Sequence, residues 1–142
     1  MIYIILPLVA GLITQVSKFF IKANRSRFTL RNIVAYSGMP SGHSAITASL
    51  ATIIGLKDGL TTPAFAVALI MAFLTIRDAV GLRRYVGKQG EIINDLVENL
   101  DEDQLLDEKY PHLAERIGHT QKQALVGIII GIIVSWLGYY LF

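Results

Sequence analysis

Two histidines of this chain stand where a polar segment gives way to an apolar one. His43 follows a run of small residues and one proline, Gly38-Met39-Pro40-Ser41-Gly42, and leads into an apolar stretch. A helix that starts there has free backbone N–H groups in its first turn, which can hold an anion such as phosphate. The plain alternative is an ordinary capped helix start. The imidazole favours chemistry, because beside an anion site it can donate a proton to a leaving group near neutral pH.

The second histidine, His119, precedes the last apolar segment, and a charged run over residues 77–88 ends the segment before it. Arg83 and Arg84 alone could be anchors that reach the membrane surface. Asp78 reaches the surface less easily, so we expect it to pair with an arginine rather than to orient a histidine. A lone histidine at a helix start is usually structural. Two imidazoles near several cations indicate phosphoryl transfer, in which one imidazole attacks, the other protonates the leaving oxygen, and the cations neutralise the phosphate oxygens.

The elements that must position these residues follow from a composition too apolar for an ordinary soluble domain. Of the 142 residues, 53% are hydrophobic and 17% are charged, which indicates an integral membrane protein. The formal net charge of +2 excludes a strongly basic nucleic-acid binder. The lack of cysteine excludes disulfide scaffolds, zinc-thiolate sites and iron–sulfur clusters. At this length we expect one membrane domain over residues 1–142.

Four apolar stretches predict an all-α integral membrane bundle of four main helices. They cover residues 2–17, 43–56, 61–79 and 124–142, and we interpret the first as an uncleaved span rather than a signal peptide. The second has only 14 residues, or about 21 Å of helix, so it must borrow length or be shielded by its neighbours.

Four spans place both termini on one side of the membrane. The loops 18–42 and 81–122, where Lys and Arg concentrate, then share the other side. The positive-inside rule puts these loops and the candidate site in the cytoplasm, in a multi-pass protein of the plasma membrane. Basic residues recruited for an anion site would produce the same bias.

Two further patterns concern packing. Residues 91–106 carry apolar side chains at helical spacing, which predicts an amphipathic helix that packs over the bundle, with a docking surface for a partner as the alternative. Gly127 and Gly131 form a G-x-x-x-G step in the last apolar stretch, and Gly138 extends this face. Such a step lets two helix backbones approach closely, either within the chain or between copies. We predict a homodimer, because a bundle with one short span has little lipid-excluded interior.

Three motifs give the chain a resemblance to a known superfamily. Pro40-Ser41-Gly42-His43 matches a P-S-G-H motif in full, and Lys18 and Arg25 show a K-x6-R spacing without the proline that follows it. Arg83-Arg84-Tyr85-Val86-Gly87 resembles the R-x-x-x-G part of a third motif, separated by an inserted loop from His119. These motifs resemble those of the type-2 phosphatidic acid phosphatase superfamily, which includes vanadium haloperoxidases. The inserted loop is similar to that of its divergent branch of small bacterial and plant membrane proteins.

The resemblance implies a role for each matching residue. His119 would be the nucleophile that forms a phosphohistidine, and His43 the general acid. Asp78 has no counterpart among the matching motifs, and we assign it to the catalytic group as a carboxylate that could support a histidine. The residues that bind the phosphate would be Lys18, Arg25, Ser41, Gly42 through its backbone N–H, Arg83 and Arg84. The resemblance implies no metal and no other cofactor, and vanadate is expected to mimic the transferring phosphate.

The third motif departs from the family at one position that bears on turnover. Gln123 stands where the family has a carboxylate that holds the histidine tautomer and stabilises the imidazolium, a task for which Glu115 or Asp78 could substitute. The sequence predicts hydrolysis of a lipid phosphate or pyrophosphate, because a site at headgroup level reaches a lipid whose tail stays in the bilayer. One alternative is a protein that binds or carries a lipid phosphate without hydrolysis. A structural membrane subunit, the other alternative, would bind neither phosphate nor vanadate.

Overall fold

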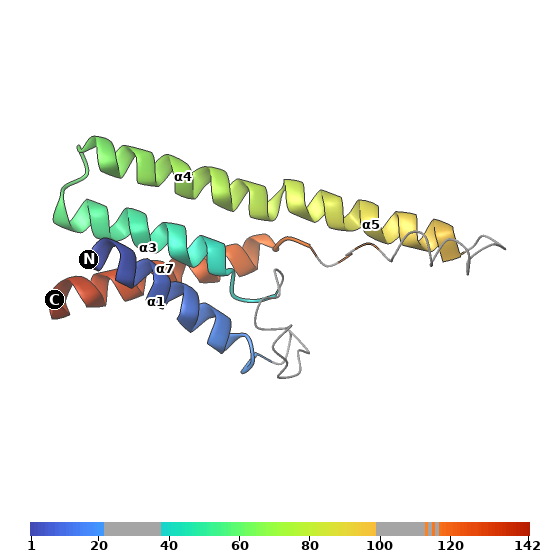
Figure 1. Ribbon diagram of the computed structural model, residues 1–142, viewed down its shortest axis with the longest axis horizontal. Coiled ribbons are helices and arrows are strands. Elements are labelled where there is room, and N and C mark those ends of the chain that lie inside the picture. The colour runs from blue at the N-terminus through green and yellow to red at the C-terminus, as the bar shows by residue number, and fades with distance from the viewer. Residues whose placement is uncertain (22–37, 99–112, 114, 116) are drawn as a thin grey trace.

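The computed structural model describes residues 1–21, 38–98, 113, 115 and 117–142, and all its regular elements are helices. The elements are α1 (Ile2–Ser17), α3 (Gly42–Lys57), α4 (Pro63–Val80), α5 (Leu82–Glu98) and α7 (Gln121–Leu141). Four of them, α1, α3, α4 and α7, lie side by side as a bundle (Figure 1). The predicted all-α membrane bundle of four main helices is therefore confirmed.

Local signals in the sequence set where three of the helices begin. Ser41 is the N-cap of α3 and its hydroxyl accepts a hydrogen bond from the backbone N–H of Ser44. Thr62 caps α4 in the same way, and Pro63 occupies the first turn, where a missing N–H costs nothing. Thr120 caps α7 in a capping box with Gln123. These residues satisfy backbone groups that a helix end otherwise leaves without partners.

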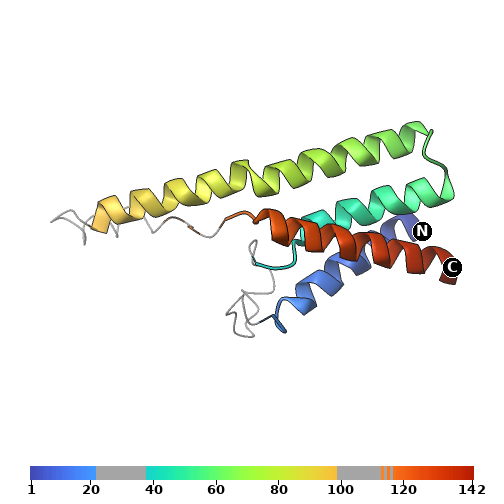
Figure 2. The ribbon, with the colours of Figure 1, turned by 180° about the vertical axis from the view of Figure 1, so that it is seen from behind.

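Helix α3 lies at the centre of the bundle, where it contacts α1, α4 and α7 (Figures 1 and 2). It has 16 residues, or about 24 Å, so it is too short to cross a hydrocarbon core of about 30 Å unaided. Its buried residues are mostly alanine and serine, which let the neighbouring helices approach closely. Of the two expectations for this helix, borrowed length or shielding by its neighbours, the contacts with three helices fit the second.

The glycines of α7 are what bring it against α3. A Cβ atom at Gly131 would lie 2.3 Å from the carbonyl oxygen of Ala45, and one at Gly127 would lie 2.3 Å from that of Ser41. Further along, the hydroxyls of Ser49 and Ser135 are 2.6 Å apart across the same interface. The G-x-x-x-G step is therefore used within the chain, and a homodimer, which stays a prediction, would need another face.

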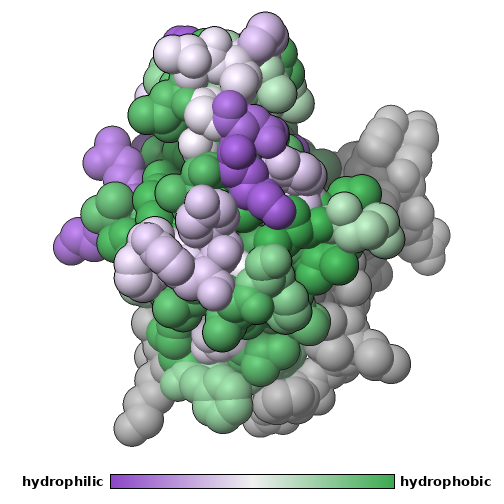
Figure 3. All heavy atoms as spheres, turned by 90° about the vertical axis from the view of Figure 1, so that its left-hand side faces the viewer, coloured by the Kyte–Doolittle hydropathy of each residue, from purple (hydrophilic) through white to green (hydrophobic). Residues whose placement is uncertain are grey.

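The ends of the bundle differ in character. The N-terminus, the C-terminus and the α3–α4 turn lie together at one end, as the four-span topology predicts (Figure 1). The hydroxyl of Tyr3 donates a hydrogen bond of 2.5 Å to Asp58 there. Hydrophobic side chains cover most of this end face, with polar groups scattered among them (Figure 3). The opposite end carries the histidines and charged residues that the sequence analysis selects as candidates for a site.

Helix α5 does not pack over the bundle, so that prediction is wrong. It continues the direction of α4 past a short break at Gly81 and extends beyond the ends of α3 and α7 (Figures 1 and 2). The break hardly bends the chain, and for this reason the amphipathic helix leaves the bundle. Its apolar side chains Ile92, Ile93 and Leu96 are exposed. Residues 99–106 of the predicted helix lie outside the described residues, and a docking role stays a prediction.

Two helical stretches are long and apolar enough to cross a membrane. They are Pro63–Glu98, which joins α4 to α5, and Gln121–Leu141, which is α7. Helix α1 is apolar but shorter, with 16 residues. Many large apolar side chains on α1, α4 and α7 are exposed, as expected for helices that face lipid.

Candidate active site

Residues from four separate segments meet at the end of the bundle opposite the termini. Lys18 follows α1, His43 lies in the first turn of α3, Asp78 lies in the last turn of α4, and His119 precedes α7. The charges of Lys18 and His43 act on His119, and those of Lys18 and Asp78 act on His43. Arg83, at the start of α5, acts on His43 as well. The structure thus brings together five of the nine residues predicted for the site, and the chain separates them widely.

The start of α3 is held rigidly by α7. The backbone N–H of Ser41 donates a hydrogen bond of 3.0 Å to the carbonyl of Gln123. The Ser41 side chain is fully buried, and its hydroxyl accepts from the hydroxyl of Ser44 at 2.9 Å as well as from the Ser44 backbone. Ser41 is thus engaged in capping the helix. Gly42 and His43 occupy the first turn, where backbone N–H groups have no acceptor within the helix.

His119 is fixed by backbone contacts to the junction of α4 and α5. Its N–H donates to the carbonyl of Ala79 at 2.8 Å, and only 3% of its surface is exposed. The preceding Gly118 has φ +89°, which favours glycine, and a Cβ there would lie 2.7 Å from the backbone nitrogen of Arg84. The sequence Gly118-His119 therefore places the imidazole against the helix junction with no room for a side chain before it.

Asn94 is a residue that the sequence reasoning missed. Its side-chain oxygen accepts from the N–H of Leu113 at 3.0 Å, and its amide donates to the Leu113 carbonyl at 3.0 Å. The same amide donates to Glu115 at 2.9 Å. Asn94 is buried together with Gly87 and Gly90, so one face of α5 receives the segment that leads to His119. The signal was present as small and amide residues at helical spacing on a helix whose other face is apolar.

Burial and nearby positive charge act on the two most enclosed groups. The pKa of His119 is lowered below 6.5, first because burial disfavours the charged form, then because Lys18 and His43 lie near; hydrogen bonds to the Gln123 side chain and the Gly38 backbone act in the opposite direction. Lys18 is 7% exposed, and burial lowers its pKa as well. An imidazole with a lowered pKa is neutral at pH 7, which is the state in which it can act as a nucleophile.

Nδ1 of His119 has no hydrogen bond to Gln123, Glu115 or Asp78, the three side chains considered for that role. Gln123 uses its side-chain oxygen to accept from the N–H of Thr120 at 2.8 Å, as part of the capping box. Glu115 is bonded to Asn94, and Asp78 accepts a hydrogen bond of 2.6 Å from Nε of Arg83. Nδ1 is buried and has no hydrogen-bond partner within the described part of the chain. The expected pairing of Asp78 with an arginine is confirmed.

The three arginines predicted for the site differ in what the structure shows of them. Arg84 is exposed, whereas Arg83 is half-buried beside Asp78. Arg25 lies outside the described residues, so its place relative to the cluster stays a prediction. Among the residues that are described, no group of three His, Asp or Glu side chains is placed to hold a metal ion.

Comparison with known proteins relates the chain to a family and to a bacterial membrane protein. The sequence pattern of the family described as "Divergent PAP2 family" matches residues 2–134. An uncharacterized membrane protein, YuiD, of Bacillus subtilis (strain 168) is 34% identical over 121 residues, which cover 78% of this chain and 75% of the relative. No solved structure matches the chain.

Proposed function

Because this chain belongs to the divergent PAP2 family, we propose that it is a membrane-bound phosphatase that hydrolyses a lipid phosphate or pyrophosphate through a phosphohistidine. The observation that carries the proposal is the meeting of Lys18, His43 and His119 at one end of an apolar bundle. Phosphoryl transfer to nitrogen requires a neutral imidazole as the nucleophile, a proton donor for the leaving oxygen and a positive charge near the phosphate. His119, His43 and Lys18 can supply these three groups.

The proposed first step forms a bond between nitrogen and phosphorus. Since Nδ1 of His119 is buried, Nε2 attacks with its lone pair, and the bond between phosphorus and the lipid oxygen breaks. His43, which is exposed, gives its proton to the leaving oxygen. In the second step water attacks the phosphohistidine, His43 takes a proton from that water, and inorganic phosphate leaves. The protons balance over the cycle, so no cofactor is required.

Cations and backbone N–H groups stabilise the charge that develops on the phosphate oxygens. Lys18 and Arg83 reach the cluster from α1 and α5, and the first turn of α3 offers the N–H of Gly42 with the positive end of the helix dipole. Arg25 and Arg84 join them in the proposal. Ser41, which caps α3, contributes by fixing this turn in place.

One observation favours a second candidate function, the binding of a lipid phosphate without turnover. Attack by Nε2 requires the proton on Nδ1, where it finds no acceptor among the described residues. A buried donor without an acceptor costs about 1–3 kcal/mol, which disfavours the reactive tautomer. A protein that has the phosphate site but no carboxylate at position 123 would still bind the lipid phosphate and would hydrolyse it more slowly.

The membrane setting supports a lipid as the substrate for either function. The relative in Bacillus subtilis is a membrane protein, and this chain has two candidate spans. We place the site on the cytoplasmic face of the plasma membrane, within a single domain over residues 1–142, on the positive-inside argument.

The test is a phosphate-release screen on the purified protein in detergent, over phosphatidic acid, phosphatidylglycerol phosphate and polyprenyl pyrophosphates. Hydrolysis predicts phosphate release and radioactive labelling of His119 from a labelled substrate. His119→Ala should abolish both, and His43→Ala should lower the rate by about 10² to 10⁴, mainly for poor leaving groups. Vanadate binding without release would support the binding function. Absence of both would overturn the two candidates together.

A further inference from the structure

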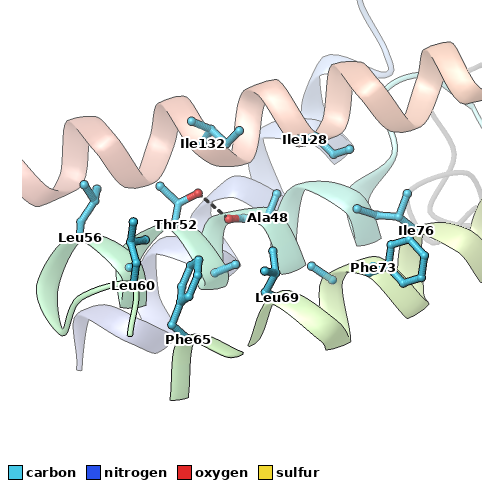
Figure 4. Close-up of a pocket in the computed structure, with 13 residues that line it drawn as sticks. Ala48, Thr52, Leu56, Leu60, Phe65, Leu69, Phe73, Ile76, Ile128 and Ile132 are labelled. Carbon is cyan, nitrogen blue, oxygen red and sulfur yellow. Dashed lines mark hydrogen bonds between the residues drawn. The ribbon is translucent and has the colours of Figure 1, made fainter. Parts of the chain in front are cut away.

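The bundle also has a groove that the proposed function does not use, away from the charged cluster. Helices α3, α4 and α7 enclose an apolar groove of about 590 Å³ (Figure 4). Its floor is formed by small residues of α3, and its walls carry larger apolar side chains, among them Leu69, Phe73 and Ile132. The side chain of Thr52 is the polar one among those that line the groove, and its hydroxyl already donates to the carbonyl of Ala48 at 2.7 Å. The groove therefore offers no unsatisfied side-chain hydroxyl to a polar ligand.

The groove leads away from the candidate active site. Ile76, at one end, lies just before Asp78 on α4, and Ile128 follows Gly127, which packs on Ser41. On α3 the lining starts at Ala48, about 8 Å along the helix axis from His43, and reaches Leu56, about 20 Å from it. A chain in one leaflet of a bilayer whose core is about 30 Å thick runs about 15 Å inward. With the headgroup at the cluster, such a chain lies along the groove.

The size of the groove suits a small apolar ligand. A volume of about 590 Å³ lies within the range of about 300–1,000 Å³ typical of small-molecule sites, which suits a single lipid chain. The small side chains of α3 that form the floor make the groove deeper without making it wider. Leu60, Leu69 and Phe73 at its rim are more than 45% exposed, so the groove opens toward the surrounding lipid.

We propose that this groove binds one hydrocarbon chain of the lipid whose phosphate is held at the cluster. The inference rests on the proposed function, in either its hydrolytic or its binding form. Bulk lipid has the same apolar chemistry, so contact with the walls alone does not select the ligand. The selection comes from tethering: a phosphate held at the cluster keeps its own chain at high effective concentration beside the groove.

The test uses the full-length protein in phosphatidylcholine nanodiscs. Two photoreactive probes carry the same diazirine in one acyl chain, one on phosphatidic acid and one on phosphatidylcholine. We expect the phosphatidic acid probe to crosslink to groove residues of α3, α4 and α7 roughly tenfold more than the phosphatidylcholine probe. Equal crosslinking by the two probes would overturn the proposal.

Three variants sharpen this result. Thr52→Phe should fill the groove and remove the excess crosslinking, while Thr52→Val keeps the shape and should retain it. Val67→Phe adds the same bulk on an exposed part of α4 outside the lining and should also retain it. Vanadate binding to Thr52→Phe should match the unmodified protein, which shows that the variant folds. Loss of crosslinking in Val67→Phe to the same extent would count against the groove.

Phosphate release measured on the same samples separates the two proposals. Crosslinking in the groove without release would leave the groove intact and reject hydrolysis. Release without preferential crosslinking would keep the phosphatase and reject the groove.

Discussion

At the scale of single residues, the chemistry of the site depends on what surrounds His119. The imidazole is buried and its backbone is anchored to Ala79, yet Nδ1 has no partner among the described residues. Gln123, at the position where the superfamily motif has an acid, caps α7 and offers His119 a neutral amide. The tautomer of His119 is therefore left without a carboxylate at this position to hold it.

Restoring that carboxylate is the sharpest test at this scale. We predict that Gln123→Asp raises the rate of phosphate release, because an acid at this position can accept from Nδ1 and stabilise the imidazolium. An orienting carboxylate contributes up to about 10⁴ in a related catalytic arrangement, so a gain of tenfold or more is expected. Aspartate in the first turn also suits the helix dipole, which keeps α7 stable. Gln123→Ala, which removes the cap without adding an acid, is the control, and an equal rate in both variants would contradict the prediction.

The pH dependence of the reaction follows from the same environment. Burial and the charges of Lys18 and His43 lower the pKa of His119, so its neutral imidazole, the nucleophile in the proposal, persists below pH 6.5. We predict that kcat/KM falls on the acid side only below that value. Lys18→Ala removes one of the two charges, raises the pKa of His119 and should move the acid limb to higher pH. The measurement is the pH at which kcat/KM falls on the acid side, not the size of kcat/KM, because Lys18 also binds phosphate in the proposal and its loss would lower the rate as well. A limb that shifts to lower pH would contradict this account.

At the scale of helices, the contact between α3 and α7 sets the geometry of the cluster. Gly127 and Gly131 remove the side chains that would keep these helices apart, and α7 then holds the start of α3 through the hydrogen bond from Ser41 to Gln123. Asn94 and Gly118 hold the segment before α7 against α5, Asn94 by hydrogen bonds to Leu113 and Gly118 by close packing on the Arg84 backbone. Close backbone contacts thus place His43 and His119 on the same end of the bundle.

This packing makes a direct prediction about stability. Gly131→Ile should destabilise the monomer by about 1–3 kcal/mol or more, because its Cβ alone would overlap the carbonyl of Ala45. The measurement is thermal unfolding in detergent, followed by circular dichroism. Ile133→Phe, at an exposed position of the same helix, is the control for added bulk. If Gly131→Ile unfolds like the unmodified protein but loses a crosslinked dimer, the glycine face serves association between copies instead.

At the scale of the whole molecule, the bundle has one polar and one mainly apolar end, and its orientation in the membrane decides which substrate pool the site meets. We predict that the cluster faces the cytoplasm, because the basic segments lie at its end of the bundle. Single cysteines at Gln89 and Thr61, both exposed, lie beyond opposite ends. In intact cells an impermeant thiol reagent should label Thr61→Cys and spare Gln89→Cys until the membrane is permeabilised. The reverse pattern would place the site outside.

The helices and the side chains available for chemistry follow from local features of the amino-acid sequence. Apolar runs bounded by Ser41, Thr62 and Thr120 fix where α3, α4 and α7 begin, because capping and hydrophobicity are local properties. The P-S-G-H motif and the histidine before the last span pointed to the cluster for the same reason, since residue type is read directly from the chain.

The contacts among those residues depend on the tertiary fold. Contacts between distant segments decide whether Gly131 meets α3 or a second copy, whether α5 covers the bundle or leaves it, and whether Glu115 meets His119 or Asn94. The groove between α3, α4 and α7 exists only because three helices splay around small residues of the first. The hydrophobic periodicity of a helix identifies the face that it buries. It does not identify what packs on that face, because a surface of small or apolar side chains can pack equally well against another helix of the chain, against lipid or against a second copy.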